Sequence, residues 1–481
     1  MNKDFKYLPK EKRKKILLIC DDIRVHSGVA TVAKEIVLRT CQHFNWVQIA
    51  GAIKHPDKGK RLDLSQNTDQ ETGLEDSSVF LYPVDGYGSP EILRQLIKLE
   101  KPDALFIITD PRYFVWLFDM EQEIRKQMPL VYLNIWDDYP APLYNKEFYE
   151  SCDVLLGISK QTVNINKIVL GDKAKDKIIR YLPHGLNSKI YYPLEVTEDI
   201  EKMEKMKYSL FGNDEVDFIL FFNSRNIRRK QIPDSMWAFR MFLDGLPKEK
   251  ADKCRFLLHT EISHEAGTDL EPIRELLFEE KYPKAIKFSL NKLSSYDLNL
   301  LYNLADVQIL LTSNEGWGLT LTEAMLSGTP FIANVTGGMQ DQMRFEDENG
   351  KWFIPSSEIP SNNTGKYKKH GEWAFPCYPT SRSIQGSPIT PYIWDDRCKP
   401  EDATKRIKEI YDMSPKERKE KGLKGREWCS SKEAGFTTEY QGKRFIETLD
   451  ELFETWKPRK KYELIDSDKD IRKTQTHNLV Y

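Results

Sequence analysis

The chain has 481 residues, of which 40% are hydrophobic and 30% charged, and its formal net charge is only −2. This length suits two domains with separate cores, and the charge balance excludes a strong long-range attraction to nucleic acid or an anionic membrane. Seven cysteines without a CxxC pair argue against a disulfide framework or a zinc site. Because no run of about 18 apolar residues occurs and the charged N-terminus lacks an apolar signal core, we expect a cytoplasmic protein.

The first part of the chain alternates short apolar runs with polar segments that are compatible with helices. The apolar runs have the length and composition of buried parallel strands, and they lie at Ile16–Cys20, Ala104–Ile108, Leu130–Ile135 and Val154–Ile158. This alternation predicts a doubly wound parallel sheet, in which ligands bind at the carboxyl ends of the strands.

A charged connection at Glu195–Asp214 separates this series from a second alternating series. The second set of predicted strands lies at Phe218–Phe222, Arg255–His259, Ala285–Phe288, Val307–Leu311 and Pro330–Ala333. The sequence therefore predicts two open α/β domains with a cleft between them. Gly365–Pro391, rich in Gly, Pro and Ser, is predicted to be a long loop, and the polar tail from Glu463 is predicted to be disordered.

The strongest functional signal lies in the segment Val307–Ala333, which has the order strand, Gly-rich loop, helix, turn, strand. Glu315 falls in the loop, and Glu323 falls on the first turns of the helix. Free N–H groups at a helix N-terminus suit a phosphate or a sugar hydroxyl, and Gly316 and Gly318 allow the backbone to approach a ligand closely. Carboxylates accept hydrogen bonds from paired hydroxyls. Taken alone, Glu323 is equally well explained by the preference of acidic residues for a helix start.

The run EGWGLTLTEAMLSGTPFIA resembles the signature of glycosyltransferase family 4, whose members are retaining enzymes of the GT-B fold. That fold has two Rossmann-like doubly wound domains facing a cleft. The matching positions are Glu315, Gly316, Trp317, Gly318, Leu319, Glu323, Ala324, Gly328, Pro330 and Ile332. The resemblance implies that Glu315 faces the donor hexose, that Glu323 holds the ribose hydroxyls, and that Gly318, Leu319 and Thr320 line the donor.

The same resemblance, which extends with gaps from about Ile16 to Ala333, implies a division of the chain. We predict an N-terminal acceptor-side domain at 1–192, an interdomain linker at 193–215 and a C-terminal nucleotide-sugar domain at 216–430. Closing helices that cross back are predicted at 431–462, followed by a tail at 463–481. The loop around Lys292 and Leu293 resembles the backbone segment that contacts the nucleobase.

A basic loop follows the predicted strand at Phe218–Phe222. Arg225 offers a planar fork and Lys230 a point charge, and both suit a diphosphate. Their spacing resembles the diphosphate clamp of the family, although the flanking glycines of that motif are missing here. Considered alone, the segment is better explained as a basic surface loop.

Three further places carry weaker signals. Gly28, at a helix start after the first strand, resembles the Gly-rich loop that approaches the donor phosphates, although helix capping by Ser27 explains it equally well. Asp137 and Asp138 follow a strand where many family members have a His. They could bind acceptor hydroxyls or form a turn before Pro140. His184, in the segment LPHGLNSKIYYP, is predicted to be a hinge residue.

We therefore predict a retaining, metal-independent hexosyltransferase that uses a nucleotide diphosphate sugar resembling UDP-glucose as co-substrate, with no cofactor. The predicted catalytic group is Glu315, Arg225, Lys230, Asp137 and Asp138. The predicted donor-binding residues are Gly28, Arg225, Lys230, Leu293, Glu315, Gly318, Leu319, Thr320 and Glu323, with no metal ligand. The expected acceptor is a saccharide or lipid-linked saccharide. Alternatives are transfer to modified bases of viral DNA, a sugar phosphorylase, and a non-catalytic sugar-nucleotide-binding protein.

Overall fold

Two parallel sheets, one in each half of the chain, organise the computed structural model, which describes residues 7–51, 56–355, 361–363 and 365–460. The first sheet has the strand order β3-β4-β2-β1-β5-β6-β7-β8, and its strands pair in parallel except for β3 with β4. Its strands are β1 (Lys14–Asp21), β2 (Phe44–Gly51), β3 (Leu62–Asp63), β4 (Val79–Pro83), β5 (Ala104–Ile108), β6 (Leu130–Asn134), β7 (Val154–Gly157) and β8 (Ile178–Tyr181).

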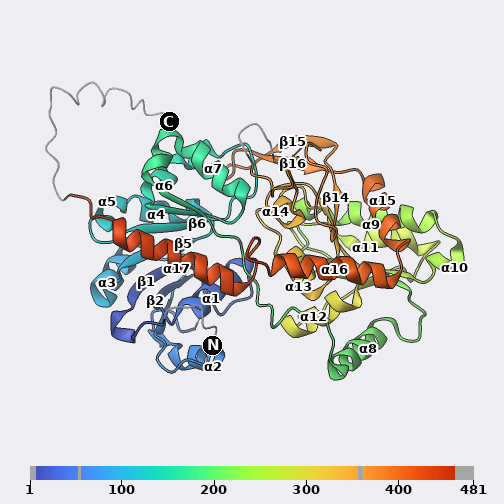
Figure 1. Ribbon diagram of the computed structural model, residues 1–481, viewed down its shortest axis with the longest axis horizontal. Coiled ribbons are helices and arrows are strands. Elements are labelled where there is room, and N and C mark those ends of the chain that lie inside the picture. The colour runs from blue at the N-terminus through green and yellow to red at the C-terminus, as the bar shows by residue number, and fades with distance from the viewer. Residues whose placement is uncertain (1–6, 52–55, 356–360, 364, 461–481) are drawn as a thin grey trace.

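Helices flank this sheet (Figure 1). The α-helices are α1 (Gly28–Thr40), α2 (Ser65–Thr72), α3 (Pro90–Glu100), α4 (Val115–Phe118), α5 (Glu121–Ile124), α6 (Lys146–Ser151) and α7 (Lys160–Leu170). The 3-10 turns are η1 (Lys10–Lys12), η2 (Pro111–Phe114), η3 (Leu143–Asn145) and η4 (Gly171–Asp176). Helices α1, α3 and α7 each begin after a serine whose hydroxyl accepts a backbone N–H, which satisfies part of the first turn.

The second sheet has the order β11-β10-β9-β12-β13-β14, and all of its strands run parallel. Its strands are β9 (Phe218–Asn223), β10 (Cys254–His259), β11 (Ile286–Phe288), β12 (Val307–Leu310), β13 (Phe331–Asn334) and β14 (Ala374–Cys377). A separate antiparallel hairpin pairs β15 (Ser381–Gln385) with β16 (Ile393–Arg397). The protein thus contains the two doubly wound α/β units that the sequence predicts.

The helices of the second half begin in the connection between the two sheets. They are α8 (Thr197–Phe211), α9 (Ile232–Asp244), α10 (Lys248–Ala251), α11 (Leu270–Arg274), α12 (Ser295–Leu304), α13 (Leu319–Ser327), α14 (Met339–Met343), α15 (Pro400–Tyr411), α16 (Pro415–Cys429) and α17 (Thr438–Thr455). The 3-10 turn η5 (Arg228–Lys230) and the π-helical turn η6 (Glu275–Glu279) complete the set. The charged connection is thus largely the helix α8, which packs against α12.

The predicted strands overlap observed strands to within two residues at either end, but the prediction of a long loop at 365–391 is wrong. Strand β14 lies inside that segment and has the sequence AFPC, whose proline cannot donate to a ladder. The strand tolerates Pro376 because β14 lies at the edge of its sheet. The first strand of the hairpin, β15, lies there as well.

Strand β2 is not among the predicted runs because polar residues interrupt its apolar pattern. Gln48 lies in its middle, is almost completely buried, and donates to the carbonyl oxygen of Asp21 at 2.8 Å. A buried side chain that is hydrogen-bonded in this way is tolerated in a core, which a pattern of apolar residues alone does not reveal.

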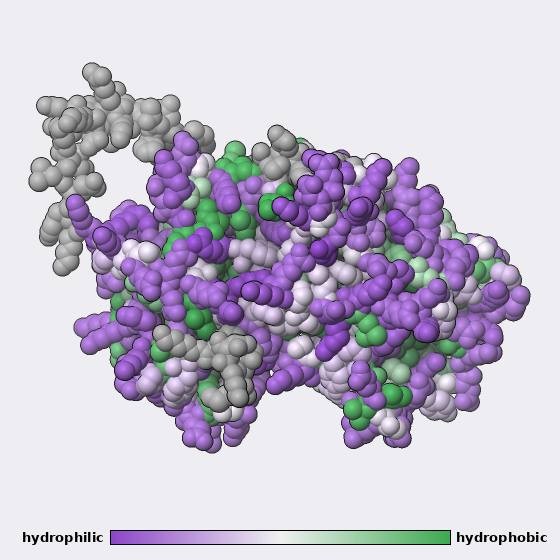
Figure 2. All heavy atoms as spheres, viewed as in Figure 1, coloured by the Kyte–Doolittle hydropathy of each residue, from purple (hydrophilic) through white to green (hydrophobic). Residues whose placement is uncertain are grey.

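The last helices cross from the second half of the molecule back to the first (Figure 1). Helix α16 packs against α13, whereas α17 packs against α1. Phe445 of α17 stacks on Trp46 with ring centroids 5.9 Å apart and lies 5.0 Å from Phe106. The sequence-based division places the closing helices at 431–462, and α17 lies within this range. The face that α16 and α17 cross is mostly hydrophilic (Figure 2).

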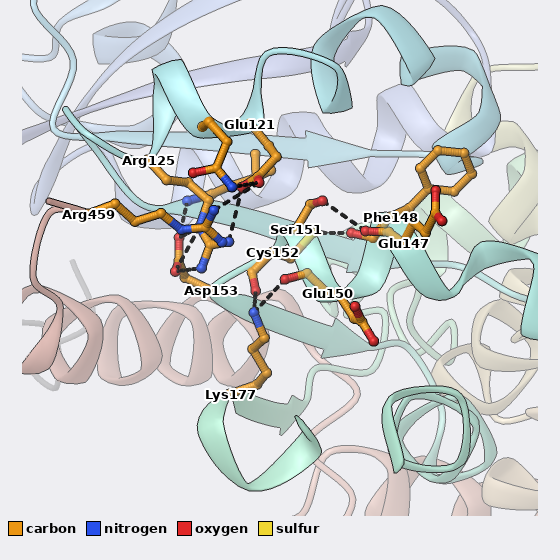
Figure 3. A network of polar contacts seen from close by, with 12 residues as sticks. Glu121, Arg125, Glu147, Phe148, Glu150, Ser151, Cys152, Asp153, Lys177 and Arg459 are labelled. Carbon is orange, nitrogen blue, oxygen red and sulfur yellow. Dashed lines mark hydrogen bonds and ion pairs between the residues drawn. The ribbon is translucent and has the colours of Figure 1, made fainter. Parts of the chain in front are cut away.

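Beyond α17 the chain is fastened to the first domain by polar contacts (Figure 3). The backbone N–H of Arg459 donates to the carbonyl of Arg125 at 2.9 Å, and its guanidinium contacts Glu121 at 2.8 Å. Arg125 in turn pairs with Asp153 at 2.6 Å. The predicted tail at 463–481 lies outside the described residues. Among the residues that are described, no helix has the length and apolarity needed to cross a membrane.

Candidate functional site

The candidate site is centred on the carboxyl ends of β9 and β12, which are neighbours in the second sheet. The turn η5 follows β9 and carries Lys230, and the loop after β12 carries Glu315. The Glu315 carboxylate forms ion pairs with the ammonium of Lys230 and with the guanidinium of Arg229, the latter at 2.7 Å. Arg229 also donates to the carbonyl oxygen of Asn314 at 2.7 Å, which fixes its fork against the loop.

This cluster keeps Glu315 ionised. Burial is the largest influence and raises the pKa of Glu315, but the charges of Arg229 and Lys230 together outweigh it and lower the pKa to about 2. Burial lowers the pKa of Lys230, and the Glu315 charge opposes this. The site therefore holds a buried carboxylate and two cations, which can exchange partners with a charged or hydroxylated ligand.

The two predicted diphosphate-binding cations differ in their burial. Lys230 is buried in the cluster, whereas Arg225 is exposed and its side chain makes no hydrogen bond or ion pair with the described residues. Arg229, four residues later, supplies the guanidinium that contacts Glu315. A role for Arg225 in holding a diphosphate stays a prediction. The sequence contains three arginines close together in this loop and gives no means of choosing among them.

Glu323 lies on α13, one turn into the helix, with several hydrogen-bond donors around it. Its carboxylate accepts from the hydroxyls of Tyr302 at 2.6 Å and Tyr191 at 3.3 Å and from the amide of Asn223 at 3.2 Å. Burial is the largest influence and raises its pKa, while these three donors lower it. This carboxylate has a well-defined orientation, with hydroxyl groups as its partners, which is the chemistry needed to bind a ribose.

The N-termini of helices α1 and α13 lie next to each other. Helix α13 begins after Gly318, whose φ of +86° suits glycine, and the hydroxyl of Thr320 in its first turn is buried without a hydrogen-bond partner in the described part of the chain. A methyl group added at Gly28, the first residue of α1, would lie 3.6 Å from Cδ1 of Leu319. The positive ends of both helix dipoles therefore face the same region, where an anion is favoured. Leu293 lies in the loop between β11 and α12, where it is partly buried against the core.

Asp137 reaches the site from the first domain, because it follows the carboxyl end of β6. Its Oδ1 accepts a hydrogen bond from the backbone N–H of Gly316 at 2.8 Å. Burial is the main cause that raises its pKa, and Glu315 adds to this effect while Arg229 opposes it. A methyl group at Gly316 would lie 2.9 Å from the carbonyl oxygen of Ile135, so glycine is needed for this close approach of the two domains.

The side chain of Asp138, unlike that of Asp137, has its hydrogen-bond partners outside the loop that carries Glu315. Its side chain is fully buried and accepts from the backbone N–H of Tyr139 at 2.8 Å and from the Gln161 amide at 2.9 Å, while the Thr336 hydroxyl lies at 3.2 Å. Burial and the nearby carboxyl of Asp396 raise its pKa well above the ordinary value. The structure thus brings Asp137, but not Asp138, together with Glu315.

The hairpin β15–β16 forms part of the surroundings of the site, and the sequence analysis does not identify it. The N–H of Trp394 donates to the carbonyl of Tyr139 at 2.7 Å, and the N–H of Asp396 donates to the carbonyl of Ser313 at 2.9 Å. The Asp396 carboxylate pairs with Arg382 of the opposite strand at 2.7 Å. This hairpin therefore bridges the end of β6 in one domain and the end of β12 in the other. Across the described ranges, no three His, Cys, Asp or Glu side chains form a group able to hold a metal ion.

Comparison with known proteins agrees with this geometry. Residues 212–359, which include Lys230, Glu315 and Glu323, match the family described as glycosyl transferases group 1. Alpha-monoglucosyldiacylglycerol synthase of Acholeplasma laidlawii is 27% identical over 201 residues, which is 40% of this chain and 46% of that protein. The chain thus spans about half the length of the curated relatives it matches.

The whole fold has solved counterparts. Sucrose-phosphate synthase of Thermosynechococcus elongatus superposes with a TM-score of 0.63 at 16% identity, covering 92% of this chain and 100% of that one. Anabaena Alr3699/HepE in complex with UDP-glucose superposes with a TM-score of 0.62 at 13% identity, covering 91% and 100%. The fold is that of the GT-B glycosyltransferases. More particularly, the second domain carries the region shared by the group 1 glycosyl transferases.

Proposed function

We propose that this protein is a glycosyltransferase that moves a hexose from a nucleotide diphosphate sugar to a hydroxyl of a saccharide acceptor. The observation that carries the proposal is the cluster of Glu315, Lys230 and Arg229 beside the N-termini of α1 and α13. Such a site combines a hydroxyl-binding carboxylate with the cations and helix ends that suit a diphosphate. The match of residues 212–359 to the group 1 glycosyl transferases supports it.

The donor would lie along the carboxyl edge of the second sheet. Glu323 binds the ribose hydroxyls, the α13 N-terminus with Lys230 and Arg229 binds the diphosphate, and Glu315 binds the hexose. UDP-glucose is the proposed donor, since the structurally similar Anabaena protein is in complex with it. The sequence signature supports assignment to family 4, and the seven cysteines, none of them disulfide bonded, support a cytoplasmic location.

The reaction needs the departing diphosphate to be stabilised. Lys230, Arg229 and the helix ends supply this stabilisation electrostatically, so that neither a metal ion nor another cofactor is required. The bond from the anomeric carbon to the phosphate oxygen breaks, and the acceptor oxygen attaches to the same face of the sugar. The acceptor proton passes to the leaving phosphate oxygen, and configuration is retained. Glu315 orients the hexose in this scheme and is not the nucleophile.

The acceptor would enter from the first domain, next to Asp137. The printed name of the Acholeplasma relative describes a glucosylated lipid, and that of the Thermosynechococcus protein describes a sugar phosphate. A saccharide shares hydroxyl chemistry with both. A DNA acceptor finds no support in these relatives.

The test begins with thermal unfolding in the presence of UDP-glucose, UDP-galactose, UDP-N-acetylglucosamine, GDP-mannose and ADP-glucose. A donor at about one hundred times its Kd stabilises the folded state by about 2.7 kcal/mol. The stabilising donor is then incubated with a saccharide panel in EDTA, and the anomeric configuration of the product is read by NMR. We expect transfer with retention. Stabilisation without transfer or donor hydrolysis would favour a binding protein, and phosphate-dependent breakdown of a disaccharide would favour a phosphorylase.

A further inference from the structure

His184 lies in the connection between β8 and α8, on a backbone that the C-terminal segment holds in place. The amide of Gln441 donates to the carbonyl of Pro183 at 3.2 Å, and the N–H of Leu186 donates to the carbonyl of Phe436 at 3.0 Å. A methyl group at Gly185 would lie only 2.4 Å from the carbonyl oxygen of Thr437. The segment is therefore tightly packed, and a hinge role for His184 stays a prediction.

The imidazole of His184 is 7% exposed and lies edge-on to the indole of Trp317, with ring centroids 6.3 Å apart. Trp317 belongs to the same loop as Glu315. The Nδ1 of His184 is buried and has no hydrogen-bond partner among the described residues. Buried polar atoms are almost always hydrogen-bonded in native proteins, so an exception at a candidate site points to a ligand.

The environment keeps this ring neutral. Burial is the main cause that lowers the pKa of His184, to about 4, and the negative charge of Glu315 opposes part of the effect. A neutral imidazole has one N–H donor and one acceptor nitrogen. Because the charge of Glu315 acts on this ring, the two groups lie close enough for one polyhydroxylated ligand to contact both, and the neutral ring can exchange a hydrogen bond with one of its hydroxyls.

We propose that His184 binds a hydroxyl of the transferred hexose and helps to determine which donor sugar is accepted. This inference rests on the proposed function and assigns a specificity residue to that site. Glu315 and His184 would then contact the sugar from the two domains, Glu315 from the loop after β12 and His184 from the connection after β8. A site built to hydrogen-bond a hydroxyl rejects the analogue that lacks it, because its own polar group is left without a partner.

The experiment compares the wild type with His184→Leu, which removes both ring nitrogens, and His184→Gln, which keeps a hydrogen-bonding group. The control is His370→Leu. His370 is partly buried and packs 6.0 Å from Phe345, with Nδ1 near the Gly371 carbonyl. For each protein, calorimetry measures the Kd of UDP and of UDP-glucose, or of the nucleotide sugar that best stabilises the wild type. Transfer kinetics are then measured with the 2-, 3-, 4- and 6-deoxy analogues of that donor.

We expect one deoxy donor to lose about 10-fold or more in kcat/KM with the wild type. With His184→Leu, the parent donor loses a similar factor, the same deoxy donor loses nothing further, and the Kd of UDP stays within about 2-fold. His184→Gln recovers part of the loss, and His370→Leu behaves as the wild type.

The outcomes separate the two proposals. If the wild type binds no nucleotide sugar, the proposed function is contradicted, and the role of His184 is contradicted with it. If the wild type binds and transfers, but His184→Leu discriminates among deoxy donors as the wild type does, only the role of His184 is contradicted. A parallel loss of UDP affinity would also overturn it, because a residue that contacts only the sugar does not affect binding of the nucleotide.

Discussion

The two domains contribute to the candidate site in different ways. On the second domain, the residues around the β12 end come from a short stretch of sequence, with Glu315 and Glu323 both between 307 and 333. On the first domain, the surroundings of the β6 end are completed by a hairpin more than two hundred residues away, through the bond from the N–H of Trp394 to the carbonyl of Tyr139. The two carboxylates proposed to bind the donor thus come from one short stretch of sequence, whereas the opposite side is assembled from segments far apart in the chain.

The largest effect is expected from Glu315 on the second domain. Glu315→Gln keeps the size of the side chain but removes the charge that pairs with Lys230 and Arg229. We expect kcat to fall about 10²- to 10³-fold, as for the loss of an oriented charge or hydrogen-bonding group in other active sites. Steady-state transfer kinetics measure this effect.

Glu35→Gln is a suitable control, because Glu35 is a largely buried carboxyl on α1 whose pKa burial raises. If Glu315→Gln and Glu35→Gln have the same kcat, Glu315 does not take part in the reaction. The second domain would then not be the side that binds the donor.

The second prediction concerns the choice between Arg229 and Arg225. Arg229 contacts Glu315, and Arg225 is exposed. We expect Arg229→Met to weaken UDP binding about 10-fold, since a charge-assisted hydrogen bond contributes about 1.5–3 kcal/mol. Arg225→Met should change the Kd by less than about 2-fold, as calorimetry would reveal. The reverse order would mean that the family spacing identifies the diphosphate ligand better than the structure does.

Arg225 and Arg229 also illustrate which features of the site could be predicted from the sequence and which could not. The alternating strands, the two α/β domains and the glutamate pair follow from apolar periodicity and one motif, because each depends on neighbours in the chain. The partner of Glu315 depends on how η5 turns, and the orientation of His184 depends on its packing against Trp317, which in turn packs against Phe436. The hairpin β15–β16 has no apolar alternation that would predict it, since most of its first strand is exposed.

A third prediction tests the contact between the domains. Asp137 accepts the N–H of Gly316 at 2.8 Å, and Asp137→Ala leaves that N–H without its partner. We expect kcat/KM for the acceptor to fall about 3- to 10-fold, while the Kd of UDP changes little, because a typical intramolecular hydrogen bond contributes about 0.5–1.5 kcal/mol. Asp137→Asn retains an acceptor oxygen and should recover part of the loss. Equal losses in UDP binding and in acceptor use would place Asp137 on the donor side instead.

The smallest effect is expected from the hairpin, through Arg382. Its guanidinium pairs with Asp396, which is fully buried beside Asp138, so Arg382→Met leaves a buried carboxyl without its cation. We expect about 1–3 kcal/mol of lost stability, measured by urea unfolding. Because the hairpin contacts Tyr139 on the first domain, the KM for the acceptor should rise about 2- to 5-fold, and the KM for the donor should stay unchanged. Arg397→Met is the control, since Arg397 ends β16, the strand that carries Asp396, and pairs with Asp234 at the surface. A rise in donor KM with an unchanged acceptor KM would assign the hairpin to the donor side. The proposed division of the site, with the acceptor on the first domain and the donor on the second, would then be wrong.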